Sequence, residues 1–93
     1  MPELKIAHLR EQGIELLVVP LESAFGDKTP EDQRLVVKTL QKRAAADGLA
    51  GNIVLVWRAG GRRTAFFAPP HCHSFCKKLT FARVVSQINR TLH

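Results

Sequence analysis

The sequence contains no long apolar run and only two cysteines. The apolar residues 16–19 are followed by Pro20, and this run is far shorter than the roughly 20 residues that a membrane-spanning helix needs. Charged residues interrupt the N-terminal stretch, so it lacks the apolar core of a signal peptide. We therefore expect a cytoplasmic protein without a membrane partner, in which Cys72 and Cys76 are free thiols.

The length of 93 residues predicts a single domain covering residues 1–93, without repeats or linkers. Fourteen Lys and Arg residues oppose eight Asp and Glu residues. Such an excess is typical of proteins that bind an anionic partner such as nucleic acid. The alternative is a basic surface that serves solubility alone.

Residues 53–70 predict a β-hairpin that forms the centre of the fold. An apolar run with β-branched residues reaches a Gly60-Gly61 pair, and a Phe-rich run follows. Two glycines suit a two-residue turn, because they adopt positive φ freely. The resulting register places Trp57 opposite Thr64, Leu55 opposite Phe66 and Ile53 opposite Ala68. Both faces of this hairpin are apolar, so other elements must cover both.

A helix is predicted from Pro30 to about Asp47. Thr29 can cap its first turn, and proline suits the first helical position. Gly48 suits the left-handed conformation that ends many helices. The expected buried stripe consists of Val36, Val37, Leu40 and Ala44.

The remaining patterns predict strands at residues 4–9 and 14–19, a loop at 21–28 in which Phe25 turns inward, and a helix at 81–92 that Thr80 caps. Residues 71–79 fit either a loop or a short helical turn. The fold class is therefore α+β, in the order β-β-α-β-β-α. We expect a mixed sheet of about four strands with two main helices. The strands at 14–19 and 53–59 should be parallel to each other and lie at the centre of the sheet.

From Ile14 onward, this order of elements loosely resembles the thioredoxin-like fold, with residues 56–61 (Val-Trp-Arg-Ala-Gly-Gly) in its hairpin. The functional motifs of that fold are absent. Ser23-Ala24-Phe25-Gly26 stand where its CxxC would be, and no proline precedes Ile53. The resemblance therefore implies a topology and no redox activity.

Four potential zinc ligands lie close together in the sequence: His71, Cys72, His73 and Cys76. Structural zinc sites usually combine two separate ligand pairs, and this sequence has no second pair. Neighbouring residues in extended chain also point in different directions. We therefore predict no metal and no cofactor, and interpret the segment as a connector.

Two groups of basic residues are candidate anion-binding sites. One is the hairpin tip with Arg58, Arg62 and Arg63, where the predicted register opposes Arg58 and Arg63 directly. The other is a helical stripe of Arg34, Lys38 and Lys42. Guanidinium groups suit phosphate, whereas a solvated surface is the alternative. Most aromatic residues occupy core positions, although single-strand binders use exposed ones for stacking.

The sequence favours a non-enzymatic binding module for an anionic partner, either nucleic acid or an acidic protein. The alternative is a protein-interaction or assembly domain, including a homo-oligomer, that uses an apolar sheet face. An enzyme is not predicted, because no group of Asp, Glu, Ser or Cys residues forms a recognisable mechanism.

Overall fold

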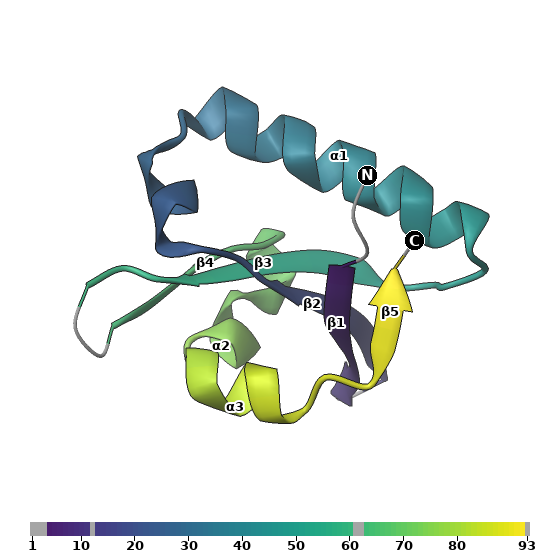
Figure 1. Ribbon diagram of the computed structural model, residues 1–93. Coiled ribbons are helices and arrows are strands. Elements are labelled where there is room, and N and C mark those ends of the chain that lie inside the picture. Colours follow the sequence, from purple (N-terminus) through teal and green to yellow (C-terminus); the bar gives the residue numbers. More distant parts are fainter. Residues whose placement is uncertain (1–3, 12, 61–62, 93) are drawn as a thin grey trace.

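A five-stranded mixed sheet forms the centre of the structure, a computed structural model that describes residues 4–11, 13–60 and 63–92. Its strand order is β4-β3-β2-β1-β5 (Figure 1). Strands β2 and β3 are parallel, and the other neighbours are antiparallel. The strands are β1 (Leu4–Glu11), β2 (Ile14–Pro20), β3 (Asn52–Arg58), β4 (Thr64–Phe67) and β5 (Arg90–Leu92).

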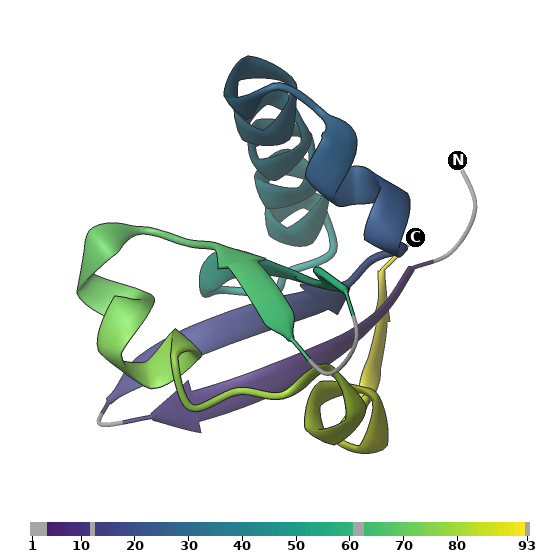
Figure 2. The ribbon, with the colours of Figure 1, turned by 90° about the vertical axis from the view of Figure 1, so that its left-hand side faces the viewer.

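Helices cover both faces of this sheet, which makes the chain one compact α+β domain (Figures 1 and 2). One face carries α1 (Pro30–Ala46) and the short 3-10 helix η1 (Ser23–Asp27). The other carries α2 (His73–Cys76) and α3 (Phe81–Ser86), preceded by the 3-10 helix η2 (Pro70–Cys72). The prediction that both apolar faces need covers is confirmed.

Strand β2 shows why two covers are needed. Its residues Leu16, Leu17, Val18 and Val19 are all fully buried. Leu17 and Val19 pack with the α1 layer, whereas Leu16 and Val18 pack with the α2–α3 layer. Because successive side chains of a strand point to opposite faces, a continuous apolar run requires packing on both sides.

Helix α1 begins and ends as the sequence predicts. The Thr29 hydroxyl accepts a hydrogen bond from the Asp32 amide at 3.2 Å. Gly48 has a φ of 76°, and the Leu49 amide donates to the Ala44 carbonyl at 2.8 Å. These bonds satisfy backbone groups that a helix leaves free at its two ends. Leu40 is buried on the inner side of the helix.

The register of the β3–β4 hairpin differs from the prediction by one residue. Leu55 lies opposite Phe67, not Phe66. The Ala59 amide donates to the Arg63 carbonyl at 3.0 Å, so the loop is longer than a two-residue turn. Gly61 and Arg62 lie outside the described residues.

A shift of one residue moves every side chain of a strand to the other face. Phe67 and Ala65 therefore pack on the α1 side, whereas Phe66 packs on the α2–α3 side. The prediction grouped Phe66 with Leu55 and was wrong, because the loop length decides the register.

The C-terminal segment also differs from the prediction. The helix expected over residues 81–92 ends at Ser86, and residues 90–92 form β5 beside β1. The side chain of Asn89 joins this ladder: its Oδ1 accepts from the His8 amide at 2.8 Å, and its Nδ2 donates to the His8 carbonyl at 3.1 Å. Pairing with β1 therefore overrides the helical spacing, and the sheet has five strands where about four were expected.

Candidate functional site

Arg58, the last residue of β3, is the candidate residue whose surroundings are best defined. Its guanidinium carbon lies 5.1 Å from the centroid of the Phe81 ring. The Phe81 amide donates to the Thr64 hydroxyl at 3.0 Å, and Thr64 lies directly opposite Arg58 in the hairpin. The end of the hairpin and the start of α3 therefore fix each other. This contact holds an exposed guanidinium on the α2–α3 side of the sheet.

Three further cations flank Phe81 in the sequence. Lys77 and Lys78 follow α2, and Arg83 lies in α3; all three side chains are exposed. The Thr80 hydroxyl accepts from the Arg83 amide at 3.2 Å and so caps α3. The α2–α3 surface, as we call it here, consists of Arg58, Lys77, Lys78 and Arg83.

The tip of the hairpin is arranged differently from the prediction. Thr64 lies opposite Arg58, so Arg58 and Arg63 are not directly opposed as the predicted register required. The predicted opposition of Arg58 and Arg63 was wrong, because the register of the hairpin is shifted by one residue. Arg63 is exposed, and Arg62 lies outside the described residues.

The candidate stripe on α1 lies on the opposite side of the sheet from α2 and α3 (Figure 2). Arg34, Lys38 and Lys42 are exposed there. Acidic residues accompany them, because Glu31 and Asp32 occupy the first turn of the same helix. The structure thus places Arg58 against Phe81, which the prediction did not include among the site residues, on the other side of the sheet from the α1 stripe.

The distribution of charge along the sequence could have indicated Lys77, Lys78 and Arg83 as candidates. No Asp or Glu follows Asp47, although half of the fourteen Lys and Arg residues do. Residues 22–47, in contrast, contain as many acidic residues as basic ones. The net charge of +6 therefore arises in the half of the chain that forms the hairpin, α2 and α3.

The four candidate metal ligands do not share one environment. Cys72 and Cys76 are both 2% exposed. Nε2 of His73 lies 2.8 Å from the Ala68 carbonyl and donates to it, whereas His71 is exposed. Within the described ranges, no three His, Cys, Asp or Glu side chains are placed to hold a metal ion. That purified protein contains no zinc remains a prediction, which elemental analysis can test.

The two thiols are poor candidates for a nucleophile. Burial raises the pKa of Cys72. Burial, together with the neighbouring Cys72, raises the pKa of Cys76 to about 11. Because the thiolate is the reactive form, both groups are largely protonated at neutral pH and react slowly.

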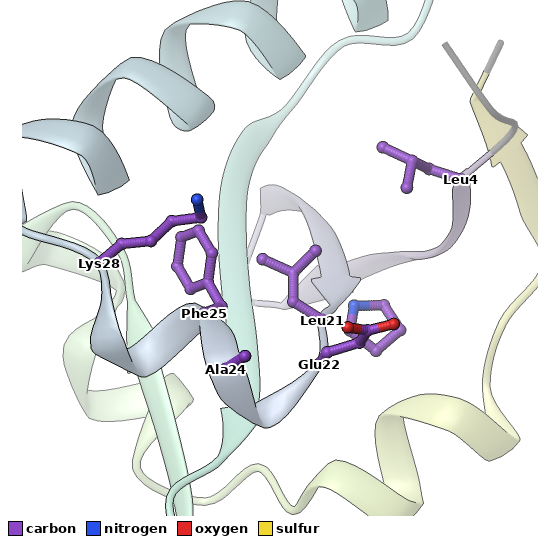
Figure 3. A pocket seen from close by; sticks show the side chains of 7 residues that line it. Leu4, Leu21, Glu22, Ala24, Phe25 and Lys28 are labelled. Atoms are coloured by element: carbon purple, nitrogen blue, oxygen red, sulfur yellow. The ribbon is translucent and has the colours of Figure 1, made fainter.

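A hollow of about 600 Å³ lies beside η1, where β2 ends (Figure 3). Its lining is mainly apolar, with the charged groups of Glu22 and Lys28 at its sides. Ligands often bind beside the carboxyl ends of parallel strands, and β2 ends here. The adjoining start of α1 does not suit phosphate, because Glu31 and Asp32 already place negative charge in the first turn.

Comparisons of the chain with protein-family models, curated proteins and solved structures found no significant match. The loose resemblance to the thioredoxin-like fold therefore gains no support from a solved structure. In the part of the chain that the structure describes, no helix has the length and apolar character needed to cross a membrane.

Proposed function

We propose that this domain is a non-enzymatic binding module for an anionic partner, either nucleic acid or an acidic protein, and that the α2–α3 surface is its binding site. The observation that carries this proposal is the position of Arg58. Its guanidinium lies over the Phe81 ring, and the sequence around Phe81 supplies the exposed cations Lys77, Lys78 and Arg83 and no acidic residue.

The geometry of Arg58 suits anion binding. A guanidinium has five N–H donors, so one that lies over a ring still has N–H groups available for phosphate or carboxylate oxygens. Because the ring restrains the side chain, less conformational entropy is lost when an anion binds. The lysines add charge that attracts an anion without fixing its orientation.

The alternative, an assembly domain that uses an apolar sheet face, has less support. The chain's own helices cover both faces of the sheet. Among the residues that the structure describes, the large apolar side chains that are exposed are Leu35 at 63% and Val85 at 45%, and they belong to different helices on opposite faces. Single exposed apolar side chains are common on monomeric proteins and do not indicate an interface.

Binding of labelled duplex DNA, single-stranded RNA and polyglutamate, measured by fluorescence anisotropy over a salt series, tests the proposal. We expect affinity to fall as salt rises, because binding an anionic polymer releases its counterions. Arg58→Ala should weaken binding and flatten the salt slope for nucleic acid by about one unit for each phosphate that the variant no longer binds. Arg58→Lys should restore only part of the affinity, because lysine lacks the planar fork.

Arg34→Ala is the matched control, since it removes one exposed arginine from α1 on the other side of the sheet. It should have a smaller effect than Arg58→Ala. Absence of binding to all three polymers at low salt would refute the proposed function. Equal effects of the two substitutions would refute the α2–α3 surface as its site.

A further inference from the structure

The hollow beside η1 has the size of a small-molecule site. Its volume of about 600 Å³ lies within the range of about 300–1,000 Å³ that such sites occupy. Leu4, Leu21 and Phe25 provide apolar lining (Figure 3), and all three belong to the cluster that packs on the α1 side of the sheet. The hollow is therefore separate from the α2–α3 surface, which lies on the opposite face.

Glu22, Phe25 and Lys28 form a row along the side of η1 that borders this hollow. The Phe25 amide donates to the Glu22 carbonyl at 3.0 Å, and the Lys28 amide donates to the Phe25 carbonyl at 3.2 Å. Such bonds join residues three apart, whose side chains lie one above the other in a 3-10 helix. The lining therefore has a carboxylate at one end, a phenyl ring in the middle and an ammonium group at the other end.

The two charged groups of this row are exposed and available to a ligand. Within the described residues, the side chains of Glu22 and Lys28 form no ion pair and no hydrogen bond. The two residues are the caps of η1. A rise of about 2.0 Å per residue therefore separates their Cα atoms by about 12 Å along the helix axis.

Contacts of η1 with the rest of the fold hold the row in place. The Phe25 ring packs edge-on against Trp57, with the ring centroids 5.0 Å apart. Nε2 of Gln33 donates to the carbonyl groups of Phe25 at 3.4 Å and of Lys28 at 3.3 Å. A Cβ atom at Gly26 would lie 2.6 Å from Nε1 of Trp57, so this close approach requires glycine. A ligand therefore meets a lining that is already formed, which lowers the entropy cost of binding.

The opposite charges at the two ends of the lining select the ligand. An apolar anion would pair with Lys28 but place its apolar part beside the Glu22 carboxylate, and an apolar cation would do the reverse. Each would remove a charge from water without a partner, which is unfavourable. A zwitterion with an apolar middle pairs with both charges. Because an extended chain covers about 3.3–3.6 Å per residue, a peptide of three residues matches the length of η1.

We propose that this hollow binds a short apolar peptide with two free termini, its ammonium group at Glu22 and its carboxylate at Lys28. The apolar side chains of the peptide then pack on Leu4, Leu21 and Phe25. A single amino acid does not suit the site, because its two charges are adjacent. The inference is independent of the proposed function, since the two sites lie on opposite faces of the sheet.

Titration of the ¹⁵N-labelled protein with the peptide Leu-Ala-Leu, followed by NMR, tests this inference. We expect the amide signals of Leu4, Leu21 and Phe25 to shift until binding saturates. N-acetylation or C-terminal amidation of the peptide should each weaken binding about two- to fivefold, the range expected for one exposed ion pair. Triglycine has the same two charges at the same spacing but should bind more weakly than either blocked peptide, because it lacks apolar side chains.

Two substitutions separate the ends of the site. Glu22→Gln should weaken binding of the free peptide about two- to fivefold and leave binding of the N-acetylated peptide unchanged. Lys28→Gln should weaken binding of the free peptide by a similar factor and leave binding of the C-terminally amidated peptide unchanged. Glu31→Gln and Lys38→Gln, which alter exposed residues of α1, are the matched controls and should change the affinity for the free peptide little.

Equal binding of the free and blocked peptides would overturn the inference, as would equal binding of triglycine and Leu-Ala-Leu. Signal shifts confined to other parts of the protein would also overturn it. Absence of binding at millimolar peptide concentrations would refute it as well, and the proposed function would then stand or fall on the anionic polymers alone.

Discussion

The two helical layers of this domain differ in how they are stabilised and in what they present to solvent. The α1 layer contains one helix of 17 residues, which has both of its ends satisfied by nearby residues. Residues 22–47, which include this layer, contain as many acidic as basic residues. The α2–α3 layer contains helices of four and six residues and no acidic residue. Short helices depend on tertiary contacts, here between Arg58, Thr64 and Phe81. The surface that we assign to binding therefore lies on the layer whose helices depend more on tertiary contacts than on their local sequence.

The largest effect on stability is expected from the core beneath α1. Leu40 is 3% exposed, so Leu40→Ala should lower the free energy of unfolding by about 2–5 kcal/mol. Leu35→Ala on the same helix, at 63% exposure, should change it by less than about 0.5 kcal/mol. Urea denaturation measures both. Equal effects would show that the buried face of α1 is assigned incorrectly.

The α2–α3 layer should lose stability at alkaline pH through its thiols. In the unfolded chain the Cys76 thiol has the ordinary pKa of 9.0, whereas the folded thiol has a pKa of about 11 and keeps its proton longer. The unfolded state then binds fewer protons between these values, so stability falls as pH rises through this window and is unaffected well below pH 9.

Urea midpoints of wild type and Cys76→Ala, measured under reducing conditions from about pH 7 to about pH 10.5, test this prediction. The difference in stability between the two proteins should shrink as pH rises. A constant difference would contradict the assigned burial of the thiol.

The junction between β5 and β1 provides a smaller effect. Asn89→Ala removes two hydrogen bonds to the His8 backbone, each worth about 0.5–1.5 kcal/mol. Hydrogen exchange of the amides in residues 4–8 should accelerate more than that of β3. Unchanged exchange in both strands would mean that the side chain of Asn89 does not hold β1 and β5 together.

The smallest effect compares the caps of the two layers. The Thr29 and Thr80 hydroxyls each accept an amide hydrogen bond at 3.2 Å. Thr→Ala at either position should cost about 1 kcal/mol, whereas Thr→Ser should cost less, because serine retains the hydroxyl. A loss at Thr29 but none at Thr80 would show that tertiary contacts alone determine α3.

Local sequence signals predicted α1, because its beginning and end depend on residues close to it in the chain: Thr29, Pro30 and Gly48. The parallel pairing of β2 and β3 also followed from their apolar content and the helix between them. These features required no knowledge of distant residues.

Features that depend on distant contacts were not predicted. The register of β4 depends on a loop longer than the two glycines suggested. Strand β5 forms because Asn89 and its neighbours pair with β1, far away in the sequence. The contact of Arg58 with Phe81 likewise joins separate elements. The lack of acidic residues after Asp47 is visible in the sequence, but it does not by itself indicate which of the basic residues there lie near one another.

The central claim is that the α2–α3 surface binds the anionic partner. Two charge-matched variants test this claim most directly. One carries Arg58, Lys78 and Arg83 replaced by alanine, and the other carries Arg34, Lys38 and Lys42 replaced by alanine. Both have the same net charge, so attraction by the whole protein is reduced equally. Anisotropy with the anionic polymer that the wild type binds most tightly should show a large loss of affinity and a flatter salt slope for the first variant only. Equal losses, or a larger loss for the α1 variant, would contradict the account.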